Sequence, residues 1–123
     1  MFILVIIISC FGCKKDNETV HGLIIGKWEW VKTIIPYGGL ESNPQTSGFS
    51  QTLEFMGNGK MKEYKNKLLI NTSDYSIEIN PSKANDNLLN STIVTSHFYI
   101  INDSLIFNEA YVDGPVSYYI RLK

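Results

Sequence analysis

The most constraining feature of this chain is a series of short segments in which apolar and polar residues alternate. The clearest is 74–80, where Tyr75, Ile77 and Ile79 alternate with polar side chains and Pro81 follows. A period of two places the apolar residues on one face of a β-strand. No sustained i, i+3, i+4 stripe of a long amphipathic helix is present. Strands are predicted at 27–35, 50–56, 60–66, 74–80, 92–101, 105–110 and 116–122.

Turn residues separate these segments at short intervals. Gly57, Asn58 and Gly59 supply the backbone freedom for a tight hairpin between two of them. The segment 92–101 is long enough for one strand or two, so we expect about eight strands, with polar loops at 36–48 and 82–90. Even spacing of strands and turns predicts a small antiparallel up-and-down β-barrel or a sandwich. A closed barrel would also leave no exposed strand edges.

Length and charge limit the classes of function. The chain has 123 residues, which supports one domain. Its formal net charge is −1, whereas binding to nucleic-acid phosphates needs clustered lysine and arginine. We therefore expect no nucleic-acid partner.

The N-terminal segment has a different character from the rest. Eight of residues 1–9 are apolar, and a polar tract begins at Lys14. An apolar stretch of about ten residues is half of what a membrane-spanning helix needs. A short β-branched run can also be a buried strand. Its position before a polar tract favours the apolar region of a secretory signal peptide.

Residues 7–10, Ile-Ile-Ser-Cys, resemble the lipobox of bacterial lipoproteins. That resemblance implies cleavage before Cys10 and a lipid on its thiol. Cys13, after the small Gly12, is the alternative, and the Lys-Lys-Asp-Asn-Glu tract at 14–18 resembles a surface-export signal of some Bacteroidetes lipoproteins. We expect an outer-membrane lipoprotein facing the periplasm or the cell surface. Its parts are a signal peptide at 1–9 (or 1–12), a lipidated tether at 10–22 and a barrel domain at 23–123.

Trp28 and Arg121 are predicted to close the barrel. Trp28 follows Gly26 and Lys27 at the start of the first strand, and Arg121 lies in the last. Arg121 is the single arginine beside ten lysines. The first and last strands of a closed barrel are neighbours, and a planar guanidinium stacks on an indole in a way that lysine does not.

Gly-x-Trp in the first strand and an arginine near the end of the last resemble the lipocalin and wider calycin superfamily. The stretch 53–60 and the Asp-Ser-Leu at 103–105 are similar to small lipocalin-like lipoproteins of Bacteroidetes. The resemblance covers residues 23–123. It implies an eight-stranded up-and-down barrel in which Trp28 and Arg121 pack across the base.

No catalytic arrangement is evident. His21 falls in the expected tether, and His97 lies in a strand next to Ser96. Adjacent strand residues point to opposite faces, so Ser96 and His97 cannot act together in a triad. Glu54 and Glu63 are expected to face each other across the hairpin, on a solvated face with nearby lysines. We expect no catalytic residue, no metal and no cofactor.

Binding is the better-supported class of function. Small barrels either hold one ligand or fill with side chains. The leading hypothesis is that a small apolar molecule binds at the barrel mouth, with the loop 36–48 covering one end. The alternative is a filled barrel that binds a protein or glycan through its loops. We expect a monomer tethered to the membrane. The candidate inward, ligand-lining residues are Trp30, Leu53, Phe55, Tyr75, Ile77, Phe107 and Tyr118.

Overall fold

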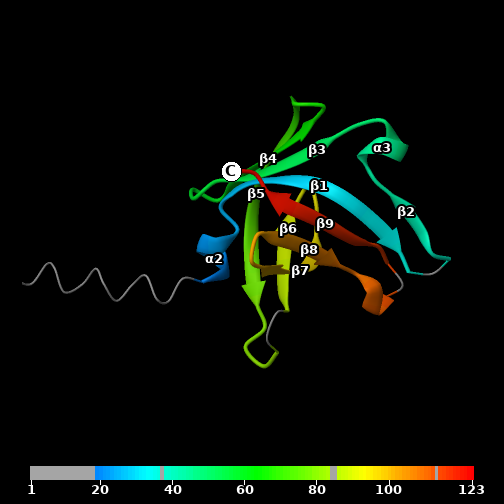
Figure 1. The fold of residues 1–123 in the computed structure, drawn as a ribbon. Coiled ribbons are helices and arrows are strands. Elements are labelled where there is room, and N and C mark those ends of the chain that lie inside the picture. The colour runs from blue at the N-terminus through cyan, green and yellow to red at the C-terminus, as the bar shows by residue number, and fades with distance from the viewer. Residues whose placement is uncertain (1–18, 37, 84–85, 113) are drawn as a thin grey trace, which may run out of the picture.

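The computed structural model describes residues 19–36, 38–83, 86–112 and 114–123. Within them one antiparallel sheet contains almost all of the regular structure (Figure 1). The elements are α2 (Val20–Leu23), β1 (Gly26–Ile35), β2 (Leu40–Ser42), α3 (Pro44–Ser47), β3 (Gln51–Phe55), β4 (Lys60–Lys65), β5 (Leu68–Ile79), β6 (Asn87–Ser91), β7 (Ser96–Ile101), β8 (Ser104–Asn108), η1 (Ala110–Val112) and β9 (Val116–Arg121).

The sheet closes on itself. Its strand order is β2-β1-β3-β4-β5-β6-β7-β8-β9, and β9 also pairs with β1. Eight strands therefore form the barrel, and β2 is an additional strand on the far half of β1. Figure 1 shows α2 at one end of the barrel and α3 and η1 at the other, which is called the mouth below. The predicted all-β, up-and-down barrel of about eight strands is confirmed.

Two segments expected to be loops contain regular structure. β6 begins within 82–90 and ends at Ser91, and the segment 36–48 contains β2 and α3. Asparagine and serine are poor strand formers, which is why β6 was not expected. Its residues are held by tertiary pairing: Leu89 is fully buried, and the buried Asn87 side chain donates to the Phe98 carbonyl. β5 is also longer than predicted, since it begins at Leu68.

α3 is a single turn fixed by its end residues. The Asn43 Oδ1 atom accepts a hydrogen bond from the Thr46 amide at 2.9 Å. The Thr46 hydroxyl accepts one from the Asn43 amide, which completes a capping box. Gly48 ends the turn in the left-handed conformation, at φ +80°. The chain then enters β3 on the mouth side of the barrel.

Trp28 and Arg121 join the two closing strands at the α2 end. They are direct partners in the β1–β9 register, and the Arg121 Cζ atom lies 4.2 Å from the centroid of the Trp28 ring. The Arg121 guanidinium also donates to the carbonyls of Leu23, at 2.8 Å, and Ile25, at 3.1 Å. Trp28 is fully buried, and its Nε1 atom donates to the Ile24 carbonyl at 2.8 Å.

Gly26 leaves room for this arrangement. Its φ is +134°, a conformation that other residues rarely adopt, and a Cβ atom there would lie 3.2 Å from the Arg121 Nη1 atom. Both the backbone conformation and the close approach of the guanidinium therefore favour glycine two residues before the tryptophan.

Residues just before position 23 also contact the barrel core. Val20 packs on the core, and Ile24, just after α2, is fully buried.

Cys10, Cys13 and the expected signal peptide lie outside the described residues. Within the described residues, α2 and α3 have four residues each, and neither is long or apolar enough to cross a membrane.

Replacing Arg121 with lysine is predicted to lower the free energy of unfolding by about 1–2 kcal/mol. The change removes the planar stacking on Trp28 and at least one of the two bonds to carbonyls. Lys123→Ala is the matched control, because Lys123 is exposed and shares only the Asp103 carboxylate with Arg121. Urea unfolding measures both variants. An Arg121→Lys variant as stable as the parent would contradict the role of this pair.

Candidate functional site

The interior of the barrel is occupied by the side chains expected to line a ligand cavity. Trp30, Leu53, Phe55 and Phe107 are at most 6% exposed and belong to one apolar cluster. Tyr75 and Ile77 are partly buried against it, as is expected for inward residues. The Phe55 and Tyr75 rings meet edge to face, with centroids 5.1 Å apart. These six residues therefore act as core at the level where a ligand was expected.

The prediction that Tyr118 faces inward is wrong. Its neighbour Tyr119 is the buried one, at 6% exposure, and its ring packs edge to face on Phe107. Tyr118 lies on the outer face, where the Lys32 ammonium sits 5.2 Å from its ring centroid. The sequence could have predicted the outward position of Tyr118. Side chains alternate between the two faces of a strand, so an inward Arg121 places residue 119 on the inner face and residue 118 on the outer face.

A hydrogen-bonded polar chain crosses the inner wall near the mouth. The Tyr119 hydroxyl donates to the Gln51 Oε1 atom at 2.9 Å, and the Gln51 Nε2 atom donates to the Glu63 Oε2 atom at 2.6 Å. The Asn71 amide donates to the other oxygen of Glu63 at 2.8 Å. Burial, and more weakly the charge of Glu63, raises the pKa of Tyr119 far above its ordinary value. The phenol is thus a neutral, permanent donor.

Glu54 and Glu63 do not face each other, contrary to expectation. Glu63 is the register partner of Leu53 and lies on the inner face, whereas Glu54 pairs with Lys62 on the outer face. The Tyr64 hydroxyl donates to the Glu54 Oε1 atom at 2.9 Å. The two carboxylates thus lie on opposite faces of the sheet, which rules out a shared acid–base role.

Two aromatic rings stack near the mouth. The Trp30 and Phe49 ring centroids are 5.6 Å apart, with 21° between the planes. The Trp30 Nε1 atom donates to the Thr33 hydroxyl, which is hydrogen-bonded at 2.8 Å to the Ser117 hydroxyl on β9. The β1–β9 register shifts between Trp30 and Lys32, and this irregularity brings Thr33 onto the same side as Trp30.

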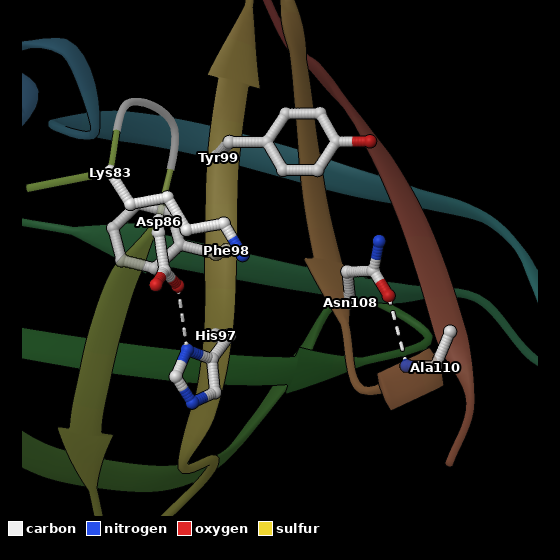
Figure 2. Close-up of a pocket in the computed structure, with 7 residues that line it drawn as sticks. All are labelled: Lys83, Asp86, His97, Phe98, Tyr99, Asn108 and Ala110. Carbon is white, nitrogen blue, oxygen red and sulfur yellow. Dashed lines mark hydrogen bonds and ion pairs between the residues drawn. The ribbon is translucent and has the colours of Figure 1, made fainter. Parts of the chain in front are cut away.

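A groove of about 480 Å³ lies against the outer face of β7 and β8 (Figure 2). Ser96 and Phe98 are buried, so alternation turns His97 and Tyr99 outward. One wall comes from the β5–β6 connection and the other from the end of β8 and η1. The lining residues are Lys83, Asp86, His97, Phe98, Tyr99, Asn108 and Ala110.

A hydrogen bond in the groove joins the β5–β6 connection to β7. The His97 Nδ1 atom is 2.9 Å from the Asp86 Oδ1 atom, and the two side chains are 34% and 21% exposed. The hydrogen bond with His97, and next the one with Asn80, lowers the pKa of Asp86 below its ordinary value. Asp86 is therefore a carboxylate at neutral pH, with its second oxygen receiving the Asn80 amide.

Ser96 and His97 form no triad. The Ser96 hydroxyl donates to the Glu109 Oε2 atom at 2.8 Å, and the same oxygen accepts the His97 backbone amide at 2.7 Å. Glu109 thus fixes the start of β7. In the part of the chain that the structure describes, no three histidine, cysteine, aspartate or glutamate side chains lie close enough to hold a metal ion.

An apolar row continues from the groove across the outer face. Tyr99, Ile106, Tyr118 and Lys32 are successive register partners on β7, β8, β9 and β1. Ile106 is only 7% exposed although it points outward. The outer wall therefore carries the rings of Tyr99 and Tyr118 on either side of a buried isoleucine, next to the groove.

Sequence reasoning missed the groove residues Lys83, Asp86, Tyr99 and Asn108. The only signal was the outward alternation of His97 and Tyr99 next to a loop that contains Asp86.

Comparison with known proteins adds no further assignment: no family model, no curated protein and no solved structure matches the chain.

Replacing His97 with phenylalanine is predicted to raise the pKa of Asp86 toward its ordinary value of 3.8, because the largest cause of the shift is removed. In the parent, the folded-state pKa is below the unfolded value. The pair therefore stabilises the fold above about pH 4, and this contribution is lost as the pH falls through the folded pKa. NMR titration of the Asp86 carboxyl carbon measures the shift. His21→Phe should leave it unchanged, and an unchanged Asp86 pKa in His97→Phe would refute the assignment.

Proposed function

We propose that the protein is a non-catalytic binding lipoprotein of the bacterial cell envelope, with a lipocalin-like barrel that binds a glycan at its outer groove. The observation that supports this most is the burial of Trp30, Leu53, Phe55 and Phe107, which fill the barrel where an apolar ligand was expected to lie. Because the interior is filled, we place the binding site on the outer wall. This is the filled-barrel alternative of the sequence analysis, made more specific by the groove.

The chemistry of the groove suits a sugar. The Tyr99 ring offers a flat apolar face, and Asp86 and Asn108 offer planar acceptors and donors beside it (Figure 2). Lys83 adds a cation for an acidic substituent. Sites of a few hundred cubic ångströms that combine apolar lining with a few polar groups are typical of small-ligand binding.

Binding of a small apolar molecule at the mouth is the second candidate. The stacked rings of Trp30 and Phe49 lie near the polar chain of Tyr119, Gln51 and Glu63. A ligand with one aromatic end and one hydrogen-bonding end would match this pairing of groups.

Native mass spectrometry of protein purified from its source separates the two sites. The proposal predicts that a bound hexose-containing mass is lost in Tyr99→Ala and retained in Phe49→Ala. Loss of an apolar ligand in Phe49→Ala alone would favour the mouth. A co-purified protein that stays bound in the Tyr99→Ala variant would contradict the assignment of a glycan to the groove.

The envelope location rests on the lipid. We expect mature protein extracted from membranes to carry acyl mass on Cys10, as the lipobox resemblance implies. Cys10→Ala should then abolish acylation while Cys13→Ala preserves it, and the reverse result assigns the lipid to Cys13. Intact-mass measurement of both variants decides this, and a mature protein without acyl mass would refute the anchor.

A further inference from the structure

The β4–β5 hairpin projects from the barrel (Figure 1). The second strand of this hairpin begins with three aliphatic residues. Leu68, Leu69 and Ile70 are 70%, 51% and 47% exposed. The turn before them is built from Asn66 and Lys67, at φ +51° and +69°. Three consecutive aliphatic side chains in water at a hairpin tip are costly to solubility, so a binding role is expected.

The tip is held in place. The Asn66 amide donates to the Ser50 carbonyl at 3.0 Å, and the Ser50 amide donates to the Asn66 Oδ1 atom at 2.9 Å. This pair of bonds fixes the turn to the residue before β3. The apolar residues are therefore presented by a braced hairpin.

Both faces of the ribbon are apolar at this point. Leu68 and Leu69 are consecutive ladder partners of Lys65 and Tyr64, so their side chains lie on opposite faces. The register shifts between Glu63 and Tyr64, which leaves Ile70 opposite no residue of β4. A protein surface docked on one face would leave the other face in water. A lipid layer surrounds a penetrating tip and covers both.

Backbone pairing limits how deep the tip can go. β5 pairs with β4 from Leu68, but its pairing with β6 starts only at Tyr75. The outer edge of 68–74 therefore carries backbone groups that β6 does not satisfy. Such groups are not tolerated in the hydrocarbon core, but headgroups and water satisfy them at the interface.

Lysines surround the apolar residues. Lys65 ends β4 and Lys67 lies in the turn itself, and the Lys65 ammonium lies 4.5 Å from the centroid of the Phe49 ring. Lys67 also lines, with Lys27, a hollow of about 500 Å³ that includes the hydroxyls of Ser50 and Thr52. Glu29 is the acidic residue of that lining. Cations beside exposed apolar residues are the pattern that binds anionic lipid surfaces.

We propose that the β4–β5 hairpin docks on an anionic lipid bilayer, with Leu68, Leu69 and Ile70 in the interfacial layer and Lys65 and Lys67 on lipid phosphates. The hairpin thereby sets the orientation of the barrel on the membrane. This site is separate from the groove and does not depend on the identity of the groove ligand.

Brominated lipids measure the depth of the tip. The full chain carrying Leu69→Trp is reconstituted in phosphatidylethanolamine–phosphatidylglycerol vesicles with bromines near the headgroup or deep in the acyl chains. The matched control is Ile79→Trp, at the other end of β5, where the native residue is 49% exposed. Because Trp28 and Trp30 are buried and common to both variants, they contribute an equal background.

We expect shallow bromines to quench the introduced indole in Leu69→Trp at least about twofold more than in the control. Deep bromines should quench this indole less than shallow ones do. The difference in quenching between Leu69→Trp and Ile79→Trp should become smaller when Lys65 and Lys67 are both changed to glutamine, or when the vesicles are pure phosphatidylcholine. Ile70→Trp repeats the measurement should Leu69→Trp fail to fold by circular dichroism. Equal quenching at positions 69 and 79 would overturn the proposal. So would an indole shielded from both lipid and iodide, which would instead indicate pairing with a second copy through the β5 edge.

Discussion

The contact between Arg121 and Trp28 is the constraint on which the rest of the barrel depends. It joins the first and last barrel strands, and the same guanidinium binds the carbonyls of Leu23 and Ile25 that lead from α2 into β1. One side chain thus connects the segment between α2 and β1, the two closing strands and the buried indole. Gly26 suits this contact because its φ is +134° and a Cβ atom there would lie 3.2 Å from the guanidinium.

This contact also fixes which residues fill the barrel. With Arg121 on the inner side, Tyr119 points inward, is buried and anchors the polar chain through Gln51 to Glu63. Tyr118 is then placed on the outer wall, in the row with Tyr99 and Ile106. The inner side chains pack against one another as the core. The polar and aromatic groups of the groove lie on the outer wall. The proposed binding at the groove follows from this division.

Local pattern predicted most of the strands and the closing pair. The hairpin at 57–59 and the alternation at 74–80 are visible in the sequence because turn type and side-chain period are local properties. β6 was missed because its strand state depends on pairing with β5 and β7, and the buried Asn87 is satisfied only by a carbonyl on β7. The groove was missed for the same reason, since Asp86 reaches His97 only through the fold. Hydrophobic periodicity carries no information on such contacts.

The most direct test of closure is an NMR measurement of the Arg121 side chain in the folded protein. The account predicts that the ring current of Trp28 moves the Arg121 δ-methylene protons upfield. It also predicts nuclear Overhauser effects between these protons and the indole, and between the β1 and β9 backbones at the Trp28–Arg121 register. Unshifted Arg121 resonances without contacts between β1 and β9 would contradict the closed barrel and the assignment of inner and outer faces derived from it.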